Sequence, residues 1–435
     1  MSREYLTETE WLDEVFEISN SHGSLKLART SIRAFDIFCK ANLELPDPDI
    51  TDLENTRQEK LATCQNPSER YEVNREIDKL IKQRFQVVFL KARNTMIAKF
   101  QAWFDQTRPD IQSICTVLQR FVRFCNKDHP EVTHLKKMSW RAKSAQSIQS
   151  YFSFIKEFLR KCYGIRLSSD DVRDFIKFPK DKKQLRQSLD IATIKKLLTH
   201  ADPKRRALYY VLLTSGMRLG EALSLKKSNF KTDVRPIQIH LHAKDTKTKE
   251  ARDTFITEEA WERVEPIYQQ TAEGEFLFHN YKEVYPATTN EDRYFGRLRT
   301  KIAKMYGDKA PCEEFPEGTG ILKRYEESIR YCVQIHAFRS YFMTKASLKH
   351  GTDYSHGIAG HHTYLDQYIR IDFEQQKKMY LELEKDLLLE SARIASKQFH
   401  QAEVAELTAR LDKLQTQVDK TNEPQAREVN WTSAY

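Results

Sequence analysis

Five residues with side chains suited to phosphoryl chemistry follow one another across about 150 residues of this chain. They are Arg218, His336, Arg339, His361 and Tyr368. Guanidinium groups are planar, stay protonated and can each bind two phosphoryl oxygens, so they stabilise negative charge that develops around phosphorus. A histidine exchanges protons near neutral pH, and a tyrosine hydroxyl can act as a nucleophile. Together these residue types predict the transfer of a phosphoryl group to tyrosine.

Each of these residues stands in a short motif. Residues 214–223 read TSGMRLGEAL and follow an apolar, helical run at 207–213, which places Arg218 just after a predicted helix. An H-x-x-R motif begins at His336, and Gly360-His361 follows about twenty residues later. About one H-x-x-R is expected by chance in a chain with 13 histidines and 71 lysines and arginines. The order and spacing of the motifs are therefore more specific than any single motif.

The ordered set resembles the active site of the tyrosine recombinases, and residues 364–370 (YLDQYIR) are most similar to archaeal and mobile-element integrases. The resemblance covers roughly residues 90–374. It implies that Tyr368 attacks a DNA phosphodiester and forms a 3′-phosphotyrosyl link, which conserves the bond energy so that strands can be rejoined without ATP. It also implies that the two arginines and two histidines surround the phosphate.

The position of the tyrosine departs from the commonest family pattern. In most members the tyrosine follows the histidine of the Gly-His motif by nine residues, and Arg370 occupies that position here, whereas Tyr368 follows His361 by seven. Tyr364 and Tyr380 are therefore alternative nucleophiles. The Y-L-D-x-Y context favours Tyr368.

The resemblance also implies a lysine that protonates the leaving 5′-oxygen, on a β-hairpin between the two arginine motifs. Residues 237–241 alternate apolar and polar side chains, as strands do, and residues 254–256 predict the returning strand. Between them the tripeptide TKT fits the family pattern, which makes Lys247 the candidate general acid. Lys244 and Lys249 are alternative candidates. If none of the three lysines is the acid, they face phosphates or are solvated in the turn.

Glu221 lies one helical turn after Arg218. A pair at this i,i+3 spacing can fix the orientation of the arginine. We assign Glu221 a structural role.

The positive charge that a DNA partner would require is unevenly distributed. The net charge of +9 is modest for 435 residues, but lysines and arginines cluster at 136–143 and 177–186. Beside a catalytic domain that binds a duplex, such clusters predict phosphate contacts, and solvated loops are the alternative. The candidate DNA-binding residues are Lys136, Lys137, Arg141, Lys143, Lys180, Lys182 and Lys183.

The composition favours a cytoplasmic protein, and the resemblance implies that it associates with DNA and uses no cofactor and no metal. Seven cysteines, an odd number without C-x-x-C spacing, indicate reduced thiols. No apolar run approaches the roughly 18 residues of a membrane span, so no membrane partner is expected. A metal site formed by His350, His356, His361 and His362 is an alternative, but no cysteine or carboxylate pair accompanies these histidines at zinc-like spacing.

Helical periodicity and a charged, proline-containing linker predict a mostly α fold with a small β-sheet, of the α+β class. Asp190 is predicted to begin the first helix of the catalytic domain. Residues 1–88 are either an arm that contacts DNA or, as we slightly favour, the first helix of the DNA-binding domain followed by an insertion. The predicted parts are an N-terminal helical region at 1–88, a helical core DNA-binding domain at 89–178, a linker at 179–189, a tyrosine recombinase catalytic domain at 190–374, and a C-terminal helix with a coiled-coil tail at 375–435.

The C-terminal region carries a possible contact between protomers. Apolar residues from 404 to 418 follow the 3-4-3-4 spacing of a coiled-coil seam. Because the family resemblance implies homotetramers on DNA that exchange C-terminal elements, we expect this helix to dock on a neighbouring protomer. A helix that folds back on its own domain is the alternative.

These observations predict a site-specific DNA recombinase, an integrase that cuts and rejoins double-stranded DNA during integration or excision of a mobile element. The nearer alternative is a type IB topoisomerase or a telomere resolvase, which uses the same chemistry. The more distant one is a non-catalytic, architectural DNA-binding protein, suggested by the short spacing between His361 and Tyr368. Covalent attachment to DNA at specific sites separates the recombinase from both.

Overall fold

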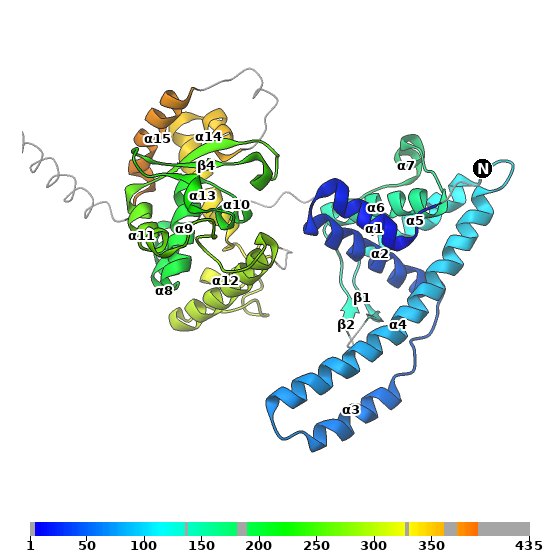
Figure 1. Cartoon of the computed structure of the whole chain (residues 1–435). Helices are drawn as coiled ribbons and strands as arrows, with labels where there is room; N and C mark the ends of the chain where they lie inside the picture. The colour runs from blue at the N-terminus through cyan, green and yellow to red at the C-terminus, as the bar shows by residue number, and fades with distance from the viewer. Residues whose placement is uncertain (1–4, 135–137, 181–188, 327–329, 361–371, 390–435) are drawn as a thin grey trace, which may run out of the picture. The chain divides into compact units, whose positions relative to one another are not determined.

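The computed structural model of the protein describes residues 5–134, 138–180, 189–326, 330–360 and 372–389. It is mostly helical with two small antiparallel sheets, which confirms the predicted fold class. The chain forms two compact units, Met1–Lys183 and Gln184–Tyr435, each with its own hydrophobic core (Figure 1). All seven cysteines are free thiols. Within the described ranges, no helix is both long enough and apolar enough to cross a membrane.

The N-terminal unit is a helical assembly with a two-stranded sheet. Its elements are α1 (Glu8–Ser19), α2 (His22–Asn42), α3 (Thr51–Thr63), α4 (Pro67–Phe104), α5 (Ile111–Cys125), β1 (His129–His134), β2 (Met138–Trp140), α6 (Ala145–Tyr163) and α7 (Ser169–Phe175).

Apolar faces of α1, α2, α4, α5 and α6 meet in one core. The ring of Trp11 lies 5.2 Å from that of Phe158, and Phe35 meets Phe121 edge to face at 5.5 Å. Such pairs remove large apolar surfaces from water. The first two helices therefore share a core with α5 and α6, and the predicted division between residues 88 and 89 falls inside the continuous helix α4.

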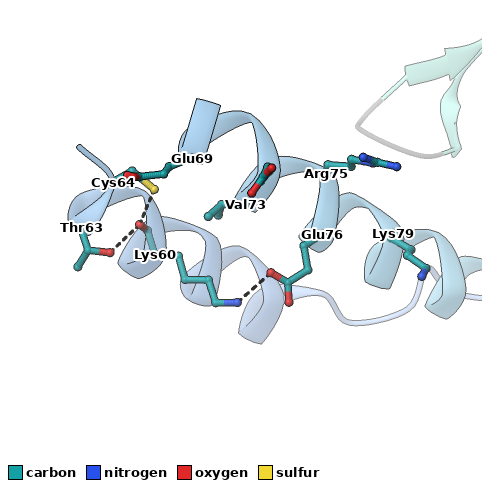
Figure 2. Close-up of a pocket in the computed structure, with 9 residues that line it drawn as sticks. Lys60, Thr63, Cys64, Glu69, Val73, Arg75, Glu76 and Lys79 are labelled. Carbon is teal, nitrogen blue, oxygen red and sulfur yellow. Dashed lines mark hydrogen bonds and ion pairs between the residues drawn. The ribbon is translucent and has the colours of Figure 1, made fainter. Parts of the chain in front are cut away.

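Helix α3 and the first half of α4 form an antiparallel hairpin (Figure 1). No residue of α3 is fully buried, and ion pairs join the two helices. Arg57 binds Asp78 at 2.8 Å, and Lys60 Nζ lies 3.1 Å from a carboxylate oxygen of Glu76 (Figure 2). Close to the turn, Cys64 lines a hollow surrounded by charged side chains.

The C-terminal unit contains the predicted arginine motifs. Its elements are α8 (Ile191–His200), α9 (Pro203–Ser215), α10 (Leu219–Leu223), η1 (Lys227–Asn229), β3 (Phe230–Lys231), β4 (Ile237–Leu241), η2 (Ala243–Asp245), β5 (Arg252–Ile256), α11 (Glu258–Gln270), α12 (Val284–Tyr306), η3 (Gly320–Leu322), α13 (His336–His350), α14 (Thr352–Ala359) and α15 (Phe373–Leu387).

Helix α9 is the centre of this unit, because every residue from 207 to 215 is buried. The ring of Tyr209 stacks on Phe338 of α13 at 5.2 Å. A three-stranded antiparallel sheet in the order β3-β4-β5 packs beside it, with Ile239 opposite Thr254. The predicted hairpin and the helix that begins at Asp190 are both confirmed, since Asp190 caps α8.

Helix α15 packs on its own unit. Tyr380, Leu383 and Leu387 on one face of the helix are fully buried. The backbone nitrogen of Glu258 donates to Glu384 at 3.0 Å. The proposed coiled-coil seam at 404–418 lies outside the described residues.

A buried ion pair joins α2 to α4 in the N-terminal unit. Arg93 lies 3.2 Å from Asp36, and both side chains are almost wholly buried. Burial raises the pKa of Asp36 to about 7, and Arg93 is the cation that most opposes this rise. Above that pH, replacing Arg93 with Met would remove the main compensation for the buried carboxylate, so we expect a loss of about 3–5 kcal/mol in the unfolding free energy of this unit. Calorimetry of the full chain can resolve this transition.

The matched control is Arg173→Met. Arg173 is exposed and pairs with Asp170 and Asp174 in the same unit, and exposed pairs contribute about 1 kcal/mol or less. Equal effects of the two substitutions would contradict a special role for the buried pair.

Candidate active site

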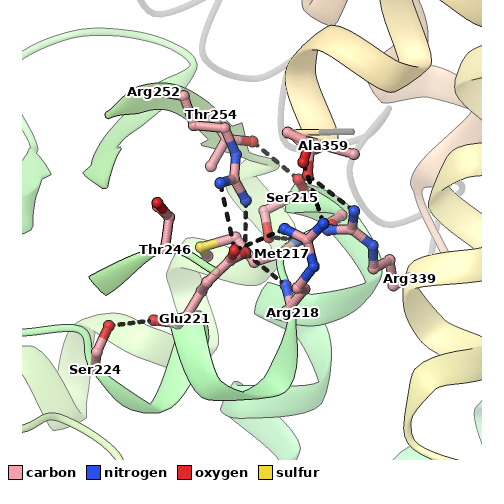
Figure 3. Close-up of polar contacts among 12 residues, drawn as sticks. Ser215, Met217, Arg218, Glu221, Ser224, Thr246, Arg252, Thr254, Arg339 and Ala359 are labelled. Atoms are coloured by element: carbon pink, nitrogen blue, oxygen red, sulfur yellow. Dashed lines mark hydrogen bonds and ion pairs between the residues drawn. The ribbon is translucent and has the colours of Figure 1, made fainter. Parts of the chain in front are cut away.

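The two predicted arginines come from separate helices and meet at one place (Figure 3). Helix α9 ends at Ser215, and the φ of +66° at its C-cap, Gly216, turns the chain sharply. Arg218 then caps the short helix α10. Arg339 lies in the first turn of α13 and is 2% exposed, whereas the Arg218 side chain is 22% exposed.

Both guanidinium groups bind the end of α14. Arg339 Nη2 donates to the carbonyl of Ala359 at 2.9 Å, and Arg218 Nη2 donates to the carbonyl of Gly360 at 3.1 Å. His361 is the next residue along the chain. The two arginines therefore hold the backbone from which the second predicted histidine follows.

The C-terminal end of α9 is held by three other elements. A helix leaves its last carbonyl groups without intrahelical partners. Tyr380 of α15 donates to the carbonyl of Thr214 at 2.8 Å, Thr254 of β5 donates to that of Ser215 at 2.9 Å, and Arg339 of α13 donates to that of Gly216. The turn that carries Arg218 is thereby attached to two helices and a strand that are distant in sequence.

Glu221 connects Arg218 to a third arginine. Arg218 Nη1 lies 2.9 Å from Glu221 Oε1, and the backbone nitrogen of Arg218 donates to Oε2 at 2.8 Å. Arg252, the first residue of β5, reaches Oε2 with Nη2 at 2.5 Å and Oε1 with Nη1 at 3.4 Å. The structural role assigned to Glu221 thus has a geometric basis, and the carboxylate is shared between two arginines.

The pKa values of Arg339 and Glu221 are shifted by burial and by the neighbouring charged groups. Burial and the neighbouring Arg218 lower the pKa of Arg339 to about 10, so the group is still charged at neutral pH. Burial raises the pKa of Glu221, but hydrogen bonds and charge from Arg252 and Arg218 outweigh it and hold this pKa below its usual value. The site therefore presents positive charge in a partly desolvated setting, where it acts strongly on an anion.

His336 and Lys247 lie on the exposed side of this framework. His336 is the first residue of α13, is exposed, and lines a cavity of about 190 Å³ together with Arg339 and Asp292. Lys247 is also exposed, in a turn that the buried hydroxyl of Thr246 stabilises by donating to the carbonyl of Glu250 at 2.9 Å. Lys247 makes no ion pair with any described residue, and Lys244 and Lys249 are equally exposed.

The remaining predicted catalytic residues, His361 and Tyr368, lie outside the described residues, as does Tyr364. Tyr380 can be placed. Its side chain is fully buried, and its hydroxyl donates a hydrogen bond to the Thr214 carbonyl. Burial raises the pKa of Tyr380 well above the usual value. Tyr380 is therefore a core residue whose oxygen is not available for attack in this structure.

The predicted DNA-binding residues are only partly described. Arg141 and Lys180 are exposed, and the Lys143 ammonium lies 4.4 Å above the ring of Trp140. Lys136, Lys137, Lys182 and Lys183 lie outside the described residues.

The metal alternative gains no geometric support from the part of the chain that can be examined. There, no group of three His, Cys, Asp or Glu side chains is arranged to hold a metal ion. The ring of His350 instead contacts the carbonyl of Met379 at 2.7 Å. His361 and His362 lie outside the described residues.

Sequence reasoning missed Arg252. Alternation along a strand places residues two apart on the same face, so Arg252 and Thr254 both point towards the turn after α9. That alternation could have been noted in the sequence. Only the folded structure identifies Glu221 as the residue that Arg252 meets.

Comparison with known families finds one matching model. Residues 181–310 match the phage integrase family. The matched segment contains Arg218 and Lys247 and ends before the H-x-x-R motif at His336.

Individual proteins and structures are also similar. Tyrosine recombinase XerC of Alcanivorax borkumensis (strain ATCC 700651 / DSM 11573 / NCIMB 13689 / SK2) is 24% identical over 163 residues, which cover 35% of this chain and 52% of that protein. The chain thus matches about half the length of this curated relative. The structure of XerH recombinase bound to difH substrate aligns with a TM-score of 0.37 at 15% identity, over 82% of this chain and 92% of that one. A lambda integrase dimer bound to a COC′ core site aligns with a TM-score of 0.39 at 13% identity, over 74% and 97%.

The turn that presents Arg218 can be tested by adding one methyl group. A Cβ at Gly216 would lie 2.3 Å from the ring of Phe342, and the φ of +66° disfavours any other residue. We expect Gly216→Ala to reduce the unfolding free energy of the C-terminal unit by about 1–3 kcal/mol, measured by thermal or urea unfolding.

Gly220 provides the control within the same motif. A Cβ there meets no atom within 4 Å, and the residue is helical. Gly220→Ala should be neutral or stabilise by about 0.5–1 kcal/mol. Similar losses from both substitutions would show that the turn has no special requirement.

Proposed function

We propose that this chain is a member of the phage integrase family, whose model matches residues 181–310, and that it is a site-specific DNA recombinase that cuts and rejoins strands through a 3′-phosphotyrosyl intermediate. One observation carries the proposal. Arg218 and Arg339, from helices far apart in sequence, bind the adjacent carbonyls of Gly360 and Ala359 and so converge beside the residue that precedes His361. Two fixed guanidinium groups at one point are suited to a phosphodiester in its transition state.

The chemistry follows from the residues. The Tyr368 hydroxyl gives its proton to His336 as its oxygen attacks phosphorus, the bond from phosphorus to the 5′-oxygen breaks, and Lys247 gives a proton to that leaving oxygen. Arg218 and Arg339 offset the negative charge on the non-bridging oxygens, while His336 and His361 complete the surroundings of the phosphate. The reverse reaction, with a 5′-hydroxyl from another strand as nucleophile, releases the tyrosine and joins the strands.

The proposed partner is double-stranded DNA carrying specific recombination sites. The N-terminal unit would bind one face of the duplex through its basic residues, among them Arg141, Lys143 and Lys180. A homotetramer on DNA fits an exchange that needs two cuts in each duplex, and residues beyond α15 are the proposed contact between protomers. We place the protein in the cytoplasm, acting for a mobile element.

The nucleophile can be identified by trapping. A nicked suicide substrate from the element's own site loses the short cleaved strand and leaves the protein attached. We expect peptide mass spectrometry to find the 3′-phosphate on Tyr368. The adduct should be lost in Tyr368→Phe and kept in Tyr364→Phe.

The other outcomes are equally informative. An adduct on Tyr364 would retain the chemistry and correct the residue. Relaxation of supercoiled DNA without any specific site would indicate a topoisomerase. Tight binding without an adduct on any substrate would contradict catalysis and favour an architectural role.

The general acid can be tested with a modified leaving group. Lys247→Ala should slow cleavage by about 10²–10⁴-fold, because the 5′-oxygen then leaves without a proton. A substrate with sulfur at the bridging 5′ position should restore the rate, since a thiolate needs no proton to leave. Single-turnover cleavage of the two substrates measures this rescue.

Lys244→Ala and Lys249→Ala are the matched controls from the same turn. Neither should show a sulfur-dependent rescue. If the rescue belongs to one of them instead, that lysine is the acid and the role proposed for Lys247 is wrong.

A further inference from the structure

Arg252 lies outside the predicted catalytic set and is placed to act on it. It is the first residue of β5, on the strand that follows the Lys247 turn, and its side chain is only 11% exposed. Its two terminal nitrogens contact the two oxygens of Glu221, at 2.5 and 3.4 Å. A two-point contact of this kind restricts the carboxylate more than a single bond does.

The same guanidinium packs against Gly360. A Cβ built on Gly360 would lie 2.7 Å from Arg252 Nη1, 2.8 Å from Cζ and 3.0 Å from Nε. Arg252 therefore covers the position where any other residue would carry a side chain. The carbonyl of Gly360 is also the acceptor for Arg218, so Arg252 contacts both partners that orient Arg218.

We propose that Arg252 is a positioning residue for strand cleavage, which holds Glu221 and Gly360 so that Arg218 is presented to the scissile phosphate. This inference rests on the proposed function. Arg252 does not itself need to touch DNA. It joins three parts of the site: the strand next to the Lys247 turn, the Arg218 motif, and the end of α14 before His361.

Charge explains why an arginine is suited to this position. The charged groups that face Glu221 are Arg218 from α10, Arg252 from β5 and Arg339 from α13. Burial alone favours the protonated form of Glu221. Without Arg252, the Glu221 carboxylate would lose the contacts that oppose burial most strongly, and its hold on Arg218 would weaken as the carboxylate takes up a proton.

Three variants test the proposal. Arg252→Met removes the charge, and Arg252→Lys keeps the charge but cannot span both carboxylate oxygens. Arg235→Lys is the matched control, because Arg235 precedes β4, pairs with Glu258 at 3.1 Å and is 54% exposed. Each variant is measured for single-turnover adduct formation at saturating DNA, for DNA affinity and for thermal unfolding.

We expect Arg252→Met to slow adduct formation by about 10- to 100-fold and Arg252→Lys by about 10-fold, the scale of a misplaced catalytic group. DNA affinity should stay within about threefold of wild type, because Arg252 is not proposed to contact DNA. The loss of a phosphate contact would instead lower the affinity and change its salt dependence. Arg235→Lys should match wild type in all three measurements.

A pH series separates positioning from general damage to the fold. The pKa of Glu221 should rise when Arg252 is removed, so the rate of Arg252→Met relative to wild type should fall further as the pH is lowered from about 8 to 5. In a Glu221→Gln background, the effect of Arg252→Met on the rate should not depend on pH. A purely structural role predicts a constant ratio in both backgrounds.

Each outcome decides between the alternatives. If Arg252→Lys forms the adduct at the wild-type rate, the positioning role of Arg252 is overturned, but the proposed function is not. The same holds if a loss of DNA affinity accounts for the slower adduct formation. If Arg252→Met does not fold, Arg252→Lys and its pH series decide. If wild type forms no adduct on any substrate, the proposed function is overturned, and this inference with it.

Discussion

The C-terminal unit is organised around one physical requirement at the C-terminal end of α9. The carbonyl groups of three successive residues, 214 to 216, have no hydrogen-bond partner within the helix. Because they are buried, each needs a donor from elsewhere in the chain. The donors are Tyr380, Thr254 and Arg339, from α15, β5 and α13. Meeting this requirement places two helices and a strand from later in the chain beside the turn that carries Arg218.

A second requirement is the balance of charge around Glu221. Like charges in a partly buried space repel one another strongly unless an anion lies between them. Glu221 is that anion for Arg218 and Arg252, whereas Arg339 relies on backbone carbonyls at Gly216 and Ala359. The framework thus keeps a surplus of positive charge at the site, which a bound phosphodiester would offset.

Local patterns were sufficient to predict much of the fold. Helical periodicity predicted a mostly α fold, and strand alternation located the β4-β5 hairpin. The continuity of α4 was missed, since the predicted division between residues 88 and 89 falls inside it, although no glycine or proline interrupts residues 68–104. In that case the absence of helix breakers was the better guide.

The candidate site was predictable to a different degree. Arg218 and Arg339 could be named from their motifs, but their meeting at the end of α14 depends on tertiary packing that no local pattern encodes. Arg252 was missed for the same reason, since its partner Glu221 lies on another element. For His361 and Tyr368, which lie outside the described residues, the motifs remain the basis of the prediction.

The uninterrupted helix α4 has a mechanical consequence for the N-terminal unit. At a rise of about 1.5 Å per residue, its 38 residues extend roughly 57 Å. Residues such as Phe89 and Phe100 pack the inner half in the core, so a rotation of the unit turns the whole helix with it. A rotation of about 10° around the inner end would move the tip by roughly 10 Å, given that length. A fluorophore at the turn between α3 and α4 would therefore amplify small reorientations of the unit into distances that can be measured on single molecules.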